Sequence, residues 1–179
     1  EILSLSGGTG TGGNFQVGNL LTVRFALKKD DGWSWKLAEM ASGRMLVSGP
    51  TSNYQRVLAQ VSDVITASVD HGDGTYSYTF ATPFPSAYLT PFNDTASFGP
   101  DQGELAGQPL QAGTYSVGAY FRWDFTVEGE ELREAGSKVH DFLFGSAATI
   151  EPRAVVSNDN CNRCHDELSA HGNSREGVG

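Results

Sequence analysis

Two cysteines and a histidine stand together near the C-terminus as Cys161, Cys164 and His165, the C-x-x-C-H pattern. Two thiols three residues apart lie along one side of a helical turn, where they can form thioethers to the two vinyl groups of a haem. The imidazole of the next residue is then placed to bind the iron as proximal ligand. The spacing therefore predicts one covalently attached haem c.

The same residues are compatible with other kinds of site. A dithiol redox pair is expected beside a βαβ pattern, which this sequence lacks. A disulfide-stabilised scaffold would need more than the 2 cysteines of this chain. Zinc could take Cys161, Cys164, His165 and His171 as four ligands, although adjacent Cys164 and His165 do not match the usual spacing of structural zinc sites. Zinc and a disulfide remain the alternatives to haem.

Three further groups of residues could take part in binding. Asp70 and Asp73 could bind calcium, but an Asp- and Gly-rich turn accounts for both carboxylates. The glycine-rich stretch 7–13 lacks the Lys-Ser/Thr ending of a phosphate-binding loop and is expected to be a flexible loop or linker. His71 and His140 are the candidates within the chain for the second axial ligand of the haem, and the sequence does not distinguish them.

Composition favours strands and turns in one medium domain with a small appendage. The chain has 179 residues, of which 39% are hydrophobic, with 22 Gly and only 2 Met. The formal net charge of −9 offers no basic surface for nucleic acid. No apolar run approaches the length of a membrane span, and the sequence starts without a signal peptide or lipidation motif. Because haem c is normally attached outside the cytoplasm, we expect a processed or truncated chain.

Period-two alternation of apolar residues predicts most of the strands. They are expected at 21–28, with a hairpin partner at 33–37, and at 75–80, 114–127 and 139–144, with one or two more within 57–69. An exposed acidic turn is expected at 128–131. Residues 82–112 hold most of the prolines and predict a long irregular excursion packed by Phe84, Tyr88, Phe92 and Phe98. The sum is about seven strands, with no helix before residue 157.

This pattern predicts a mainly β fold, either an antiparallel sandwich or a split Greek-key β-barrel, over residues 1–152. The predicted inward face comprises Leu21, Val23, Phe25, Tyr76, Tyr78, Tyr115, Val117, Phe121 and Phe142. A short helical haem-c-binding segment, from about residue 160 to 170, is expected to follow. Residues 153–179 would then be the truncated start of a haem-binding domain.

The C-terminal run resembles the outer-membrane multihaem (decahaem) c-type cytochromes of the OmcA/MtrC family. The resemblance rests on residues 153–157, the C-x-x-C-H motif, Leu168, His171-Gly172 and Arg175, and the stretches 72–80 and 113–117 are similar to the N-terminal β domain of that family. It implies split β-barrel domains alternating with haem-packed domains. This chain departs from the family in having one C-x-x-C-H where the family has many, so it looks like the N-terminal β domain plus the first haem site.

The resemblance also implies a role for His171 as distal ligand to a neighbouring haem. Six residues separate His171 from His165, and an extended run of six spans only about 20 Å, which would have to pass around the ring edge to reach the opposite face of the same haem. The second haem would belong to a longer chain or to another chain. A surface histidine before a glycine cap is the alternative.

The implied function is electron transfer from the cell envelope to extracellular metal oxides, flavins or a partner cytochrome. Such a chain is an electron carrier more than an enzyme, and its partners would be other haem domains, cytochromes or another copy of the chain. Its location would be the cell surface, the outer membrane or the extracellular space, with the periplasm as the other extracytoplasmic choice. The alternatives are a β-type binding or assembly module with the haem segment as an appendage, and a peroxidase-like haem enzyme, for which no distal Arg-His pair is found.

Overall fold

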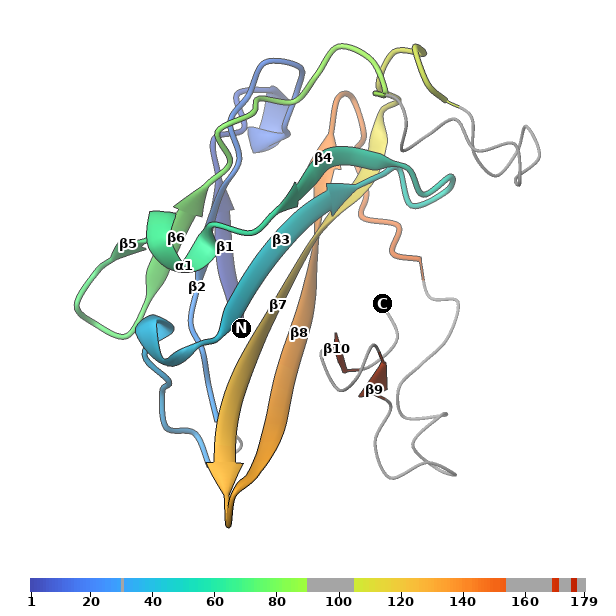
Figure 1. Cartoon of the computed structure of the whole chain (residues 1–179). Coiled ribbons are helices and arrows are strands. Elements are labelled where there is room, and N and C mark those ends of the chain that lie inside the picture. Colours follow the sequence, from blue (N-terminus) through green and yellow to red (C-terminus); the bar gives the residue numbers. More distant parts are fainter. Residues whose placement is uncertain (30, 90–104, 154–168, 171–174, 177–179) are drawn as a thin grey trace.

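The computed structural model describes residues 1–29, 31–89, 105–153, 169–170 and 175–176, and it is mainly β (Figure 1). Its strands are β1 (Ile2–Ser6), β2 (Thr22–Phe25), β3 (Ser42–Ser48), β4 (Arg56–Val61), β5 (Val69–Asp70), β6 (Tyr76–Thr79), β7 (Gly113–Val127), β8 (Glu130–Phe144), β9 (Ser169–Ala170) and β10 (Arg175–Glu176). The helical pieces are η1 (Thr11–Gly13), η2 (Leu37–Glu39) and α1 (Val64–Ala67).

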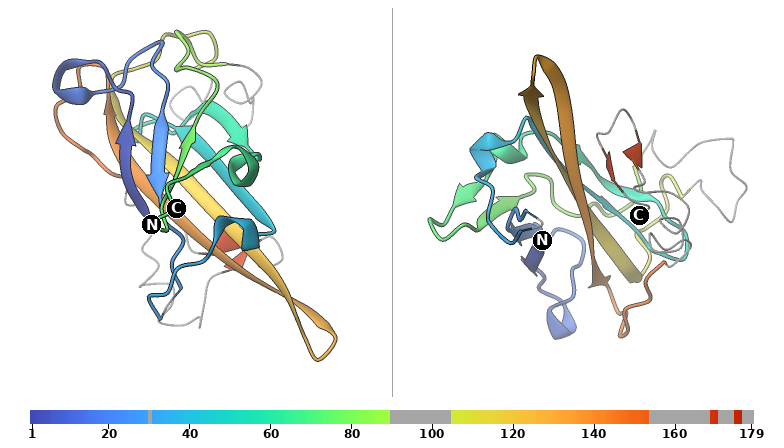
Figure 2. Two further views of the ribbon diagram at one scale, coloured as in Figure 1. Left: turned by 90° about the vertical axis from the view of Figure 1, so that its left-hand side faces the viewer. Right: turned by 90° about the horizontal axis from the view of Figure 1, so that it is seen from below.

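Eight of these strands form two four-stranded antiparallel sheets. One sheet has the order β1-β2-β6-β5 and the other the order β4-β3-β7-β8, and β9 and β10 pair separately. The two sheets face each other across a shared core, as the views in Figures 1 and 2 show. The expectation of a mainly β fold is confirmed, and of the two architectures considered the sandwich describes these sheets.

All nine residues predicted to face inward are buried. The strands of both sheets contribute aromatic rings, which pack across the interface between the sheets. Phe25 of β2 stacks on Phe121 of β7 at a ring distance of 5.3 Å, and Phe15 and Phe84 bring loop residues against Phe142 of β8. At Gly49 an added Cβ would stand 2.4 Å from the Tyr115 ring, so a side chain there would displace the core.

The expected strands 21–28, 75–80 and 114–127 correspond to β2, β6 and β7, but two strands were missed. β1 has an exposed-intermediate pattern with no buried face, and β3 was not recognised in Ser42–Ser48. The expected hairpin partner at 33–37 is present only as a short pairing beyond the end of β2. The Lys29 amide donates to the Trp33 carbonyl at 2.8 Å, the Trp35 amide donates to the Leu27 carbonyl at 3.0 Å, and an isolated bridge joins Lys28 to Ser34, so no strand forms there. The region 57–69 contains β4, α1 and the start of β5, so the expectation of no helix before residue 157 is also wrong by one short helix.

β7 and β8 form a hairpin of two 15-residue strands, longer than the sequence predicted. Glu128 and Gly129 join them, both at positive φ (52° and 88°), which is the backbone of a two-residue hairpin turn. β8 begins at Glu130, well before the predicted start at residue 139. Exposed residues occupy both faces of its first half, so alternation could not reveal it.

The proline-rich excursion is irregular where it is described. Phe84 and Tyr88 are both 1% exposed, as expected of residues that pack it against the core. Two isolated bridges, between Ala87 and Pro109 and between Tyr88 and Ala106, join its two ends. Phe92 and Phe98 lie outside the described residues.

Candidate haem-attachment segment

The four predicted site residues, Cys161, Cys164, His165 and His171, lie outside the described residues. Their roles therefore stay predictions, and the geometry available is that of the chain on either side. On the C-terminal side, Ala170 of β9 pairs with Arg175 of β10 in an antiparallel hairpin. This pairing requires extended backbone at Ser169 and Ala170. The expected helix from 160 to 170 therefore does not reach its predicted end.

On the N-terminal side, the sandwich holds the chain that leaves β8 toward the cysteines. The Asn14 amide Nδ2 donates to the carbonyl oxygens of Gly145 (2.9 Å) and Ala147 (2.8 Å). The amide of Gly145 in turn donates to the Phe15 carbonyl at 2.8 Å. One loop residue thus binds two carbonyls, those of Gly145 and Ala147, in the segment 145–153, called the linker below.

Two buried threonines fix the next part of the linker. Glu151 donates its amide hydrogen to Thr114 Oγ1 at 2.7 Å, and its carbonyl accepts from Thr51 Oγ1 at 2.6 Å. The same Thr114 hydroxyl lies 3.4 Å from the Thr149 carbonyl, and the Thr51 amide bonds the Thr114 carbonyl at 2.8 Å. Thr51 and Thr114 are 9% and 3% exposed. Both backbone groups of Glu151 are therefore satisfied by side chains of the sandwich.

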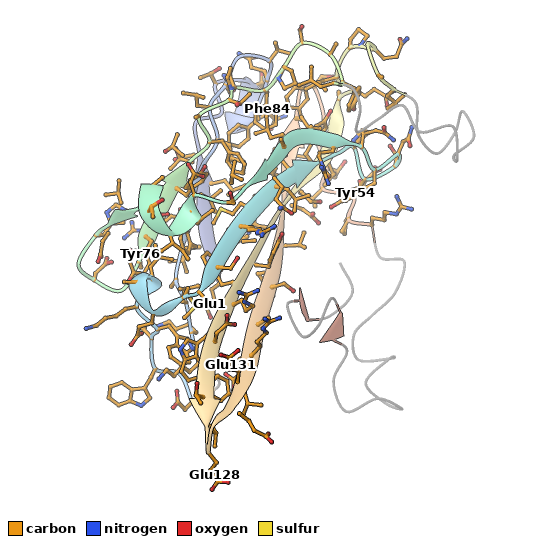
Figure 3. The ribbon with its side chains drawn as sticks, in the orientation of Figure 1. Glu1, Tyr54, Tyr76, Phe84, Glu128 and Glu131 are labelled. Atoms are coloured by element: carbon orange, nitrogen blue, oxygen red, sulfur yellow. The ribbon has the colours of Figure 1, made fainter. Side chains whose placement is uncertain are left out.

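The last described residue of the linker meets an aromatic ring. The Arg153 guanidinium carbon lies 5.8 Å from the centre of the Tyr54 ring, within the range of a cation–π contact. Figure 3 shows Tyr54 on the side of the sandwich where the linker leaves. Beyond the motif, β10 contacts β8. The described residues on both sides of C-x-x-C-H thus lie against the sheet that contains β7 and β8.

Buried tyrosines support the start of β7, next to Thr114. The Tyr115 hydroxyl donates to the Gln111 carbonyl at 2.7 Å and lies 3.1 Å from the Tyr88 hydroxyl. Burial is the largest cause that raises the pKa of Tyr115 far above its usual value, and the neighbouring Tyr88 adds to it. The neutral hydroxyl therefore persists to high pH and keeps its donated hydrogen bond.

No sequence signal marks the residues that anchor the linker. Thr51 and Glu151 are 100 residues apart, and Asn14 and Ala147 are 133 apart. A threonine that binds the linker cannot be recognised from its neighbours in the sequence, because any threonine at the end of a strand has a similar local sequence. Pro152 and the end of the alternation at residue 150 marked where the linker lies, but not what holds it.

The two other histidines occupy different sheets. His71 lies exposed in the turn between β5 and β6, where its Nε2 is 2.8 Å from Ser77 Oγ. His140 is half-buried on β8 opposite Val117. Neither position tests which of them is the second axial ligand.

Asp70 and Asp73, at the turn between β5 and β6, accept hydrogen bonds from nearby groups. Asp70 Oδ1 accepts from the Gly72 amide at 2.8 Å, and Asp73 accepts from Thr75 and from Arg24, whose Nη2 lies 3.1 Å from Oδ2. The hydrogen bond from the Thr75 hydroxyl is the main cause that lowers the pKa of Asp73. Within the described part of the chain, no group of three or more His, Cys, Asp or Glu residues could hold a metal ion. No helix among the described residues is long and apolar enough to cross a membrane.

The glycine-rich stretch is a loop, as expected, and hydrogen bonds close it on itself. Gly10 donates to the Asn14 carbonyl at 2.9 Å, and residues 11–13 form η1. Thr9 Oγ1 accepts from Gln16 and Asn19 at 2.8 and 2.9 Å. This closure holds Asn14 in place to bind the linker.

The chain was compared with known proteins. No family model matches it, and no curated protein matches it. Among solved structures, it is similar to the crystal structure of the outer membrane decahaem cytochrome OmcA, with a TM-score of 0.52 and 19% sequence identity. The match covers 96% of this chain and 27% of that one. At this identity the likeness shows a shared fold, and the chain spans about a quarter of the length of the protein it matches.

Proposed function

We propose that this chain is an electron-transfer module of a c-type cytochrome, in which a β-sandwich carries one covalently attached haem. Cys161 and Cys164 would form the thioethers and His165 would bind the iron as proximal ligand. The observation that carries the proposal is the C-x-x-C-H motif, which begins eight residues after Arg153 at the end of a linker that the sandwich contacts at Glu151 and Arg153. The fold shared with a decahaem cytochrome supports it independently of the motif.

The donor set fits haem c better than the other groups considered. Two thiols and one adjacent imidazole supply two thioether positions and one axial nitrogen, so each residue has a separate partner on the haem. A zinc site would need Cys164 and His165 to bend onto one ion. When bound, the haem would supply a one-electron couple, with no substrate transformed.

The protein's own contribution is to position this group. Thr51 and Thr114 hold both backbone groups of Glu151, so the chain enters the motif from a fixed point on the sandwich. The β9–β10 hairpin, which contacts β8, would restrain the chain beyond it. His171 falls between those two strands, and we assign it as distal ligand to a neighbouring haem, with the second ligand of the Cys161–Cys164 haem still to be identified.

We further propose that the module works outside the cytoplasm in a longer multihaem protein. The similar structure is described as an outer membrane decahaem cytochrome, and this chain covers 27% of it. Residues 153–179 would begin the haem-binding domain after the β domain at 1–152. The partners would be neighbouring haem domains or cytochromes, with extracellular metal oxides or flavins as final acceptors.

Spectroscopy on the chain produced in cells that attach haem c tests the proposal. An electron carrier with two axial imidazoles should give a low-spin spectrum that changes reversibly on reduction with dithionite and reoxidation. A high-spin iron that reacts with peroxide would indicate an open axial position and a haem enzyme instead.

The role of His171 needs the longest natural chain. Replacing His171 with Met should shift the reduction potential of a second haem and leave that of the Cys161–Cys164 haem unchanged. If only the Cys161–Cys164 haem responded, the assignment of His171 to a neighbouring haem would be wrong.

A further inference from the structure

The end of the β7–β8 hairpin extends beyond the sandwich as an arm, defined as residues 123–134. β3 pairs with β7 from Ser48–Ser116 to Ser42–Arg122, so among the described strands only β8 pairs with the β7 residues past Arg122. Figures 1 and 2 show the hairpin continuing past the other strands, and Figure 3 shows Glu128 at its tip. An isolated two-stranded ribbon is marginally stable in water, so the side chains of the arm must support it.

One face of the arm is aromatic and aliphatic. Trp123 stacks on Phe125 at 4.4 Å with an interplanar angle of 14°, and Trp35 from the loop before η2 packs on Trp123 at 4.4 Å. Phe125 lies opposite Leu132, and Val127 follows at the tip on the same face. Leu132 and Val127 are 40% and 48% exposed. This face, with Trp35, is called the arm face below.

The opposite side of the arm neutralises its own charges. Arg122 Nη2 donates to Asp124 Oδ2 at 3.0 Å, while its Nε lies 2.9 Å from Oδ1 without the alignment of a hydrogen bond. Arg133 lies 3.8 Å from the same carboxylate. These three residues form an ion-pair cluster on that side of the ribbon, so the side available to bind a partner is the arm face.

Carboxylates surround the arm face. Glu130 lies opposite Val127, Glu134 opposite Trp123, and Glu128 stands at the turn between them. In the described part of the chain, none of the three is within salt-bridge distance of a basic group. The three carboxylates around exposed apolar side chains form an acidic rim that is not balanced on the arm itself.

A cleft of about 710 Å³ opens at the base of the arm face, between the edges of the two sheets. Its lining includes Trp35, Trp123 and Phe121, and it carries charges of both signs, Lys28, Lys29 and Lys138 beside Glu1, Asp31 and Glu134. Lys29 Nζ lies 4.0 Å from the centre of the Trp35 ring. The base of the arm face is therefore mixed in charge, whereas Glu128 and Glu130 lie at its outer end.

We propose that the arm face is a docking surface for a partner protein that presents an apolar centre surrounded by lysine and arginine side chains. Aromatic side chains such as the half-buried Trp123 and Phe125 are typical binding hot spots, and an acidic rim is complementary to a basic one. A second copy of this chain would bring the same carboxylates against each other, so charge disfavours a symmetric dimer here. One hairpin face is a small interface, so the complex should be weak, rapidly formed and sensitive to salt.

A lysine-rich mitochondrial-type cytochrome c, whose exposed haem edge is ringed by lysines, is a suitable probe in titration calorimetry. Binding should be measurable at low salt and should weaken about tenfold in Phe125→Ser and in Leu132→Ser, which leave the charge unchanged. Glu130→Gln with Glu134→Gln should weaken binding as well. Asp70→Asn with Asp73→Asn removes the same two charges at the β5–β6 turn and is the matched control, which should bind almost as the parent does.

Thermal unfolding checks that each variant stays folded. If either Phe125→Ser or Leu132→Ser does not fold, the other variant still tests the arm face. Equal weakening by both double variants would mean that only overall charge matters and would overturn the proposal. Absence of binding at low salt would overturn it too. A dimer in sedimentation that Phe125→Ser dissociates would identify a second copy as the occupant, against the proposal. The test needs no haem, so its failure leaves the electron-transfer function standing.

Discussion

Tyr78 shows how one buried side chain makes the stability of the sandwich depend on pH. Its ring is buried on β6 and its hydroxyl donates to Asp63 Oδ1 at 2.7 Å. Burial is the main cause that raises the pKa of Tyr78 well above its usual value of 10.0, and the hydrogen bond to Asp63 adds to it. Above about pH 10 the unfolded chain loses the proton of this hydroxyl, whereas the folded chain keeps it because the pKa of Tyr78 is raised. Stability from this group is therefore complete below about pH 10 and is lost as the pH rises further.

We expect Tyr78→Phe to flatten the alkaline loss of stability. Asp63 is exposed, so its carboxylate can bond to water when the tyrosine hydroxyl is removed. Urea midpoints measured between about pH 9 and pH 11 should fall less in this variant than in the parent chain. The exposed Tyr54→Phe is the control. Parallel curves for Tyr78→Phe and the parent would show that Tyr78 has no part in the alkaline transition.

Phe25 tests the core at the same scale. It is 1% exposed and its ring contacts those of Phe121 and Tyr76 at 5.3 and 5.8 Å. Phe25→Ala should lower the free energy of unfolding by about 3–5 kcal/mol, because it removes a buried ring and leaves a cavity. Chemical denaturation measures this difference. A loss below about 1 kcal/mol would place Phe25 outside the core.

At the scale of elements, alternation predicted some strands that bury one face but not all of them. β3 buries Gly43, Met45 and Val47 alternately and was missed, because Leu46 between two of them is apolar as well. β2, β6 and β7 each bury alternate residues, so their sequences were sufficient. β1 and the first half of β8 have no buried face to signal them, and their existence depends on tertiary pairing. Residues 33–37 alternate, yet Trp33 is 75% exposed, and the segment pairs with residues 27–29 through one bridge and two backbone hydrogen bonds before η2 begins at Leu37.

The turn of the β7–β8 hairpin depends on Gly129. Gly129 has a φ of 88°, which L side chains rarely adopt, and nothing lies within 4 Å of an added Cβ. Gly129→Ala should therefore destabilise the arm by about 1–2 kcal/mol through backbone strain alone. Amide hydrogen exchange of the arm should speed up while that of the core strands stays constant. Faster exchange throughout the core would instead show that the turn controls the whole sandwich.

For the whole molecule, the linker joins the sandwich to the candidate site. The sequence contains the C-x-x-C-H motif and predicted the β domain, but it did not show how the two are connected. The anchors Thr51, Thr114 and Asn14 are distant in sequence from the linker. The motif carried a chemical signal of its own, whereas the hydrogen bonds of these anchors exist only after folding. The boundary between the β domain and a haem domain stays a prediction.

Loosening the linker should expose it to protease. Thr51→Val with Thr114→Val removes both side-chain hydrogen bonds to Glu151, at a cost of about 1 kcal/mol each. Trypsin should then cleave the Arg153–Ala154 bond faster, as followed by mass spectrometry of the fragments. Thr126→Val, on the arm, is the control. An unchanged rate of cleavage at this bond would mean that the threonines do not hold the linker.

The mass of the intact chain, produced in cells that attach haem c, shows whether Cys161 and Cys164 carry a covalent haem. We expect a coloured protein whose mass exceeds the 19.1 kDa of the sequence by one haem. The haem should resist extraction by acid-acetone, and Cys161→Ser with Cys164→Ser should abolish its covalent attachment. A colourless protein of sequence mass, or a haem that acid-acetone removes, would rule out haem c at these cysteines.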